Sequence, residues 1–362
     1  MKLVCFACRR KFLIIWLLIC TFIAVLMIFP DECRNGGTNG TYLCIQVLIP
    51  SLFPFMFITN FVVCSGLILH SPRILRVLCR FMFSLPDVCS SVVIMSMLGG
   101  YPTGAAGIGA LYNKGYITKT QARKMALFCV ASGPGFLVTY TGSVMLGSPE
   151  SGYILLASQC IAFILIGVIT RFIITDGNGA AAHPEKLKTK SLRIGASITE
   201  AVSLTIKSSS YMCGFVVLFS VFFEVFISLT TKHPNLQKLS AFIEITNGIK
   251  ILAGNTSVVT IAFFCGFGGL CVHFQIFQLL SKTGVNKLFF YLMRILQGIF
   301  SATATYLLIR IFPQSQEVFS TIKNAKTTVY SEGLGCVFLI LSCVIFLISL
   351  RYNNKEISFN RR

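Results

Sequence analysis

Long runs of apolar residues, interrupted at a few places by glycine and proline, constrain this chain more strongly than any other feature. A helix needs about 20 predominantly apolar residues to cross a bilayer, and comparable runs recur from Phe12–Phe29 to Gly333–Leu350. Of all residues, 55% are hydrophobic and only 12% are charged. The pattern predicts an all-α, polytopic transmembrane protein whose surface mostly faces membrane lipid.

The interruptions fall in both halves of the chain. Leu98–Gly104 and Cys265–Leu270 are expected at matching places, and Ser132–Gly135 and Glu244–Gly248 add one further break to each half. Broken helices at corresponding positions are typical of transporters built from structural repeats. We therefore predict two inverted repeats with re-entrant hairpins and broken helices, which face each other around a site near the bilayer midplane.

The same pattern divides the chain into five segments. We predict an N-terminal signal-anchor helix with an external loop (1–41), a first repeat (42–174), a basic cytoplasmic linker (175–199), a second repeat (200–312), and a C-terminal transmembrane helix with a cytoplasmic tail (313–362). Within the first repeat, Pro50 and Pro54 predict a kinked span. Arg73, Arg76 and Arg80 share one helical face and predict a helix that lies at the membrane surface.

The basic character of the chain is best explained by membrane topology. The formal net charge is +19, but lysine and arginine occupy short segments between apolar runs and form no continuous stripe on a soluble domain. Loops rich in lysine and arginine stay in the cytoplasm. We expect both termini inside, in a bacterial cell membrane, and no nucleic-acid partner; the sequence leaves the oligomeric state open.

Several classes of chemistry lack their motifs in this sequence. Cys5 and Cys8 form a CxxC without a second metal-binding pair, and the four histidines are scattered, so we expect no metal and no cofactor. A nucleotide-binding G-x-x-x-x-G-K-[ST] and a hydrolase G-x-S-x-G are both absent. We therefore predict a protein that is not an enzyme and does not drive transport by hydrolysing ATP.

Irregular backbone inside a bilayer needs either tight helix packing or a wet cavity, because bare N–H and C=O groups are costly in hydrocarbon. Small-residue helix packing is the alternative for each break taken singly. Taken together, the breaks favour a substrate cavity, and the candidate substrate-binding residues are Ser51, Phe53, Pro54, Gly99, Gly100, Tyr101, Pro102, Thr103, Gly104, Ser132, Gly133, Pro134, Thr246, Asn247, Gly248, Gly268 and Gly269.

A carboxylate beside one of these breaks is a candidate for ion or proton coupling. Glu244 precedes Thr246 and Asn247, and a membrane-embedded carboxylate requires a cation, a proton or a hydrogen-bond donor. We predict that these three residues serve a coupling proton or sodium ion. Lys207 is a possible charge partner of the substrate; snorkelling of its ammonium group to the interface is an equally acceptable interpretation.

The motifs resemble those of the YlbJ/SpoVV family of sporulation integral membrane proteins. The residues that carry the resemblance are Pro50–Phe55, Gly99–Ala105, Ser132–Pro134 and Glu244–Gly248. The resemblance implies a Gate or nucleoside-recognition domain, an architecture similar to concentrative nucleoside transporters, and export of dipicolinic acid from the mother cell across the outer forespore membrane. Phe53, Phe55, Tyr101 and Phe136 could stack on such an aromatic dianion.

Two alternatives to an anion carrier stay open. A nucleoside transporter of the same architecture would show more neutral hydrogen-bonding side chains and fewer cations near its site. A sporulation membrane sensor or assembly factor that transports nothing would tolerate changes in the cavity. For a carrier, we expect leucine at Gly100 or Gly104 to block transport and leucine at Gly167 to do much less.

Overall fold

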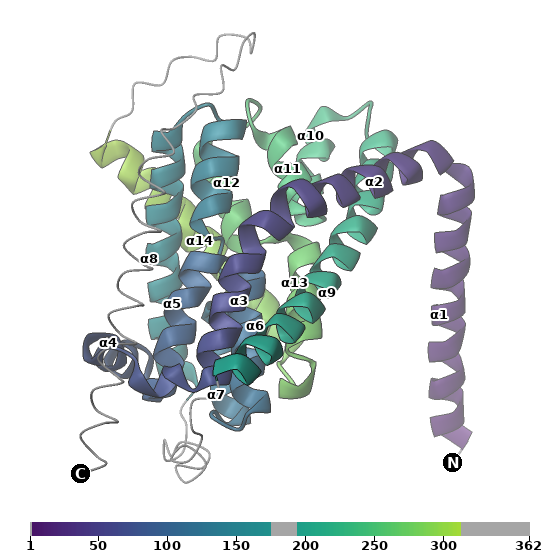
Figure 1. The fold of residues 1–362 in the computed structure, drawn as a ribbon. Coiled ribbons are helices and arrows are strands. Elements are labelled where there is room, and N and C mark those ends of the chain that lie inside the picture. Colours follow the sequence, from purple (N-terminus) through teal and green to yellow (C-terminus); the bar gives the residue numbers. More distant parts are fainter. Residues whose placement is uncertain (1, 175–193, 313–362) are drawn as a thin grey trace, which may run out of the picture. The chain divides into compact units, whose positions relative to one another are not determined.

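The computed structural model describes residues 2–174 and 194–312, and all regular structure in these ranges is helical (Figure 1). Five helices are long and apolar enough to cross a membrane, or up to six if the bent pair Arg73–Phe83 and Asp87–Gly99 is one span. These helices confirm the all-α, polytopic prediction. The predicted C-terminal span and residues 175–193 of the linker lie outside the described residues.

The first half of the described chain contains two helix breaks. Its elements are α1 (Lys2–Ile28), α2 (Pro30–Leu43), α3 (Ile49–Ser65), α4 (Arg73–Phe83), α5 (Ser90–Gly99), α6 (Tyr101–Asn113), α7 (Lys119–Phe128), the π-helix η4 (Gly135–Met145) and α8 (Pro149–Ile173). Gly100, at a φ of 81°, separates α5 from α6, a conformation that glycine adopts without steric cost. Residues 129–134 separate α7 from η4.

The second half follows a similar order in its elements. They are α9 (Ile194–Leu229), α10 (Pro234–Gln237), the 3₁₀-helix η6 (Lys238–Phe242), α11 (Ile245–Leu252), α12 (Val258–Phe267), α13 (Gly269–Leu279) and α14 (Lys287–Ile311). By this order, the break at Gly100 corresponds to the turn at Glu244, and Ser132–Gly135 corresponds to Gly268. The sequence had instead suggested that Leu98–Gly104 matches Cys265–Leu270.

The segment predicted as an external loop, residues 30–41, is helical. Pro30 begins α2, a favoured position because its missing N–H needs no partner there. Gly36 and Gly40 lie against α9: a Cβ at Gly36 would stand 2.6 Å from the Ser220 carbonyl oxygen, and one at Gly40 would stand 2.8 Å from the Cα of Val217. These glycines therefore permit close helix packing.

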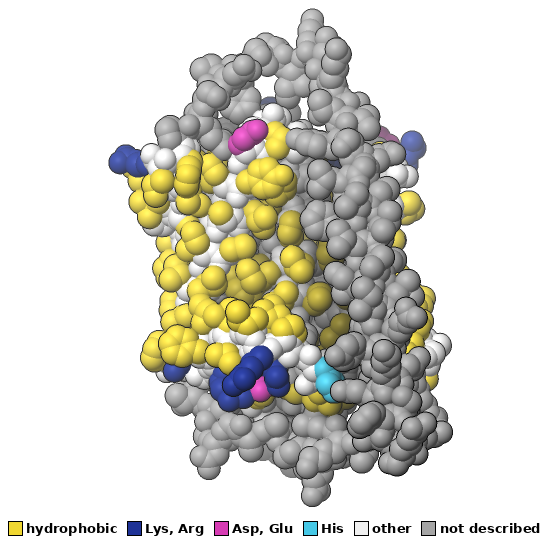
Figure 2. Space-filling view, turned by 60° about the vertical axis from the view of Figure 1, so that its left-hand side comes forward, with side chains coloured by type: hydrophobic (Ala, Val, Ile, Leu, Met, Phe, Trp, Pro, Cys, Tyr) yellow, Lys and Arg dark blue, Asp and Glu magenta, His cyan; other side chains and the backbone are white. Residues whose placement is uncertain are grey.

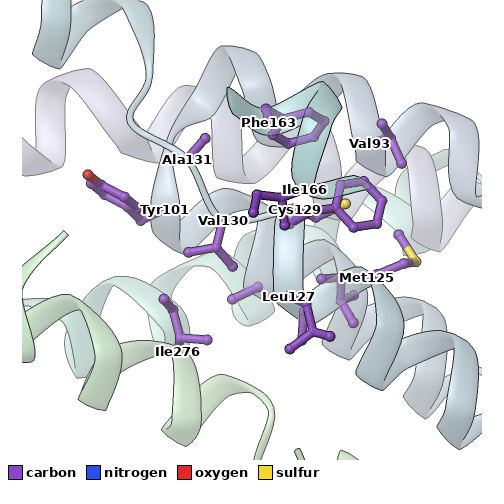
Figure 3. Close-up of a cluster of buried hydrophobic side chains, with 14 of the residues drawn as sticks. Val93, Tyr101, Met125, Leu127, Cys129, Val130, Ala131, Phe163, Ile166 and Ile276 are labelled. Atoms are coloured by element: carbon purple, nitrogen blue, oxygen red, sulfur yellow. The ribbon is translucent and has the colours of Figure 1, made fainter. Parts of the chain in front are cut away.

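Apolar side chains cover much of the face shown in Figure 2, and charged side chains gather toward its upper and lower margins. Exposed apolar residues of this kind include Phe172, Leu292 and Leu307. Inside, Phe128 packs against Phe83 and Phe163, with ring centroids 4.8 and 5.3 Å apart. Figure 3 shows buried apolar side chains around the end of α7, among them Phe163, Ile166 and Met125. A lipid-facing exterior and a packed interior are what a membrane bundle requires.

One end of the bundle is fixed by contacts between elements distant in sequence. Lys114, after α6, forms an ion pair with Glu200 near the start of α9 at 2.7 Å. Arg123 of α7 donates from Nε to the carbonyl oxygen of Thr283, between α13 and α14, at 3.1 Å. We call this end, which is the lower one in Figure 1, the basal end.

Candidate functional site

A cavity of about 600 Å³ lies where breaks from both halves meet. We call it the central cavity. Its walls come from α3, the α5–α6 break, the segment after α7, η4, α9, the turn before α11 and α13. Among the candidate residues predicted from the sequence, it brings together Ser51, Gly99, Gly100, Tyr101, Pro102, Gly133, Glu244 and Thr246. Cavities of this size are typical of small-molecule sites.

Glu244 lies at the tip of the second-half hairpin. Its side chain is buried, with 2% exposed, and it caps the N-terminus of α11. Oε1 accepts from the backbone N–H of Thr246 at 2.9 Å, and Oε2 accepts from that of Asn247 at 2.7 Å. A carboxylate is favoured here by the unpaired N–H groups and the positive end of the helix dipole. Glu244 thus holds the hairpin tip together as well as lining the cavity.

Tyr101 joins three of the breaks through its hydroxyl group. It begins α6, and its hydroxyl donates to the carbonyl oxygen of Cys265 in α12. Ser132, in the break after α7, donates to the Tyr101 hydroxyl oxygen and lies 3.0 Å from the same carbonyl oxygen. The Tyr101 ring also contacts Gly268, where a Cβ would stand 3.2 Å away. These contacts connect the two halves at Tyr101, which lines the central cavity.

Tyr140 connects η4 with the second-half hairpin. Its hydroxyl donates to the Thr246 carbonyl oxygen at 2.7 Å, and its ring stacks on Phe136 with centroids 5.5 Å apart. Tyr140 was not among the residues predicted from the sequence, and neither were the polar residues Gln46, Thr139 and Gln275, which also line the cavity. Gln46 and Gln275 could have been found as amides inside apolar runs, where polar side chains are costly.

Other predicted residues lie outside the cavity lining, namely Phe53, Pro54, Thr103, Gly104, Ser132, Pro134, Asn247, Gly248, Gly268, Gly269 and Lys207. Gly104 packs against the Cys129 carbonyl, and Gly248 packs against Ala241. Asn247 donates from Nδ2 to the Ser220 hydroxyl at 3.3 Å. For these glycines the structure shows the helix-packing role that the sequence left open.

The central cavity has an unusual balance of polar groups. Within the described ranges, no lysine or arginine lines it, and Glu244 is its acidic residue. Neutral hydrogen-bonding side chains come from Gln46, Ser51, Thr139 and Gln275. In residues 2–174 and 194–312, no group of three or more His, Cys, Asp and Glu side chains is placed to hold a metal ion. The cavity is therefore suited to a mainly apolar ligand with a few polar groups.

Arg294 of α14 stabilises the end of α7, next to the segment that lines the central cavity. It is fully buried, and its guanidinium donates to the carbonyl oxygens of Leu127 and Val130, where α7 ends. It also donates to Oε1 of Gln297. In the other half, Gln159 of α8 donates from Nε2 to the Ala262 carbonyl oxygen of α12 at 3.2 Å. Arg294 of α14 and Gln159 of α8 thus each donate to a carbonyl oxygen in the broken helix of the opposite half.

Replacing Arg294 with methionine should destabilise the protein by about 2–4 kcal/mol, because buried carbonyl oxygens lose their donors. We expect the apparent melting temperature of the purified protein to fall by about 5 °C or more. Arg310→Met is the matched control, since Arg310 lies on the same helix, is exposed and stacks on Tyr306. Equal melting temperatures for the two variants would contradict the proposed support of α7.

The comparisons with known proteins agree with the resemblance seen in the motifs. The chain is 24% identical over 330 residues to the sporulation integral membrane protein YlbJ of Bacillus subtilis strain 168, and the match covers 79% of each chain. This similarity confirms the resemblance to the YlbJ family. No protein-family model matches the chain, and no solved structure matches it significantly. Together with its apolar helices, the similarity to YlbJ supports an integral membrane protein.

Proposed function

We propose that this chain is a secondary transporter of a small aromatic metabolite and that the central cavity is its substrate site. One observation carries the proposal: the break at Gly100–Tyr101, the break at Gly133 and the turn at Glu244–Thr246 converge on a single cavity. Discontinuous helices that meet at one site are a recurrent feature of secondary transporters. Phe136 and Tyr140 offer a stacked aromatic wall for a planar ligand.

The two halves would then be inverted repeats, and alternating access would follow from movement of one against the other. The matching order of long helix, short helix, hairpin, broken helix and long helix supports this arrangement. The basal end, with Lys114 and Arg123, would face the cytoplasm because basic segments remain on that side.

Dipicolinate is our first candidate substrate, exported by a mother cell during sporulation across the outer forespore membrane. The candidate comes from the resemblance to YlbJ, whose name places that protein in sporulation. Since the described lining of the central cavity contains no lysine or arginine, the dianion would depend on the N-terminal ends of α6 and η4 and on protonation of Glu244 for charge balance.

A nucleoside is the second candidate, and a specific observation favours it. The neutral side chains of Gln46, Ser51, Thr139 and Gln275 can hydrogen-bond to a neutral base and sugar without charge compensation. A nucleoside site is expected to have more neutral hydrogen-bonding side chains and fewer cations than an anion site, and this lining has that composition.

Transport in vesicles that contain the purified full-length chain tests the proposal. We expect saturable movement of labelled dipicolinate, with competition by unlabelled dipicolinate and none by uridine or adenosine; protein-free vesicles give the background. Saturable uridine movement that dipicolinate does not inhibit would replace the first candidate with the second. If neither compound moves under a proton or sodium gradient, a membrane sensor or assembly factor becomes the better explanation.

A further inference from the structure

A second cavity, of about 310 Å³, opens at the basal end of the bundle. We call it the basal cavity. Its lining includes Ala106 and Gly109 of α6, Ser208 of α9 and Gln278 of α13. The same three helices line the central cavity, and α9 and α13 lie next to each other in Figure 1. Asn60 of α3 adds a fourth shared helix.

The two cavities lie within about one helical turn of each other along α9 and α13. On α9, Tyr211 lines the basal cavity and the next residue, Met212, lines the central one. On α13, Gln275 lines the central cavity, and Gln278, three residues later, lines the basal one. Three residues of helix rise about 4.5 Å, so the layer between the cavities is thin.

Close packing of α6 against α13 closes this layer. Ala105 and Ile108 of α6 and Ile276 of α13 are fully buried. Near the basal side, a Cβ at Gly109 would stand 3.0 Å from the Leu279 carbonyl oxygen. The packing of α6 against α13 is therefore part of the layer that separates the two cavities.

Charge distinguishes the basal cavity from the central one. Lys114, Lys207 and Lys282 line it, and Glu200 is its acidic residue among the residues that the structure describes. Glu200 is already paired with Lys114 at 2.7 Å, so Lys207 and Lys282 supply surplus positive charge. Burial by itself lowers the pKa of Lys114, but the hydrogen bond with Glu200, together with the charges of Cys64, Glu200 and Tyr116, outweighs burial and leaves that pKa above its ordinary value.

We propose that the basal cavity binds small organic carboxylates through Lys207 and Lys282 and forms the basal end of the path that leads to the central cavity. The idea that the two cavities form one path rests on the transport function proposed above. The sequence offered Lys207 as a possible charge partner of the substrate, with snorkelling as the alternative; the structure places it in the basal cavity, outside the central one, where it can capture an anion first. Both lysines line one cavity and are exposed, so two ammonium groups are accessible to a dicarboxylate.

The site can be tested by placing a cysteine in the basal cavity and comparing how fast negatively and positively charged thiol reagents modify it. In the full-length protein carrying Ser281→Cys, we expect a negatively charged thiosulfonate to modify Cys at position 281 faster than a positively charged one of similar size, with modification measured by mass spectrometry. Adding Lys207→Gln and Lys282→Gln should lower this rate ratio by about tenfold, the scale expected for two nearby unit charges. Millimolar dipicolinate should slow modification only when both lysines are present.

Lys232→Gln is the matched control, since Lys232 follows the far end of α9 and is exposed. It should leave the rate ratio and the dipicolinate protection unchanged. An unchanged ratio in the Lys207→Gln/Lys282→Gln protein overturns the proposal, and so does a lowered ratio without dipicolinate protection. If protection is intact but no substrate moves in vesicles, the carboxylate site stands and the transport function fails. If dipicolinate is transported with the same KM by the parent and the double variant, the basal site has no role in the path.

Discussion

Leucine at Gly135 should reduce transport at least tenfold while the protein still inserts and folds. Gly135 lines the central cavity, and a Cβ added there meets no atom within 4 Å, so the new side chain would occupy ligand space without displacing protein atoms. A ligand that must share the cavity with four extra carbon atoms loses its contacts with the aromatic wall. Initial transport rates, normalised to the amount of folded protein, measure the effect.

Gly214→Leu provides the control for this variant. Gly214 lies on an exposed face of α9, outside the central cavity, and its added Cβ also meets nothing within 4 Å. Gly167, the control suggested by the sequence, is unsuitable because its Cβ would strike the ring of Phe83. Gly104→Leu is also ambiguous, since it would collide with the Cys129 carbonyl. Equal transport by the Gly135 and Gly214 variants would remove the central cavity from the mechanism.

Glutamine at Glu244 should abolish gradient-driven accumulation and leave part of the exchange activity. The substitution removes the charge change that a coupled proton or cation requires. It also weakens the cap of α11, because the glutamine side chain has one acceptor oxygen for the two N–H groups of Thr246 and Asn247. We expect a loss of stability of about 1–3 kcal/mol from the unsatisfied N–H.

Accumulation and exchange must therefore be compared at equal amounts of folded protein. Ser220→Ala is a useful companion, because it removes the hydrogen bond to Asn247 beside the same turn and keeps the carboxylate. If the Ser220→Ala protein accumulates substrate and the Glu244→Gln protein only exchanges it, coupling depends on the charge. Undiminished accumulation by the Glu244→Gln protein would limit Glu244 to the role of a helix cap.

The sequence was most informative where residue chemistry conflicts with the bilayer. Glycine, proline and a carboxylate inside apolar runs are costly unless the fold satisfies them, so Gly100, Tyr101 and Glu244 could be identified without coordinates. Their convergence could not be measured from the sequence, because it depends on contacts such as that between Tyr101 and Cys265, 164 positions apart.

Residues whose role depends on contacts with distant parts of the chain were not predicted correctly from the sequence. The glycine-rich sequence of α2 was predicted to be a loop, because the α9 residues that pack against Gly36 and Gly40 lie far along the chain. The sequence left Lys207 open between substrate pairing and snorkelling, because the direction in which a helical side chain points depends on how its helix is rotated. Tyr140 was missed because an aromatic residue in an apolar run carries no local sign that its hydroxyl has a specific acceptor.

The hydroxyl of Tyr101 has a mechanical consequence for this bundle. It bonds to the Cys265 carbonyl and to Ser132, and so fastens the first hairpin and one broken helix of each half at a single point. No one of these three segments can swing away alone without leaving buried polar groups unpaired, which costs about 1–3 kcal/mol for each group. The junction therefore opposes movement of any one segment by itself and favours movement of the three segments as one unit. Such linked movement would suit the proposed carrier, because a segment that opened alone would leave a leak.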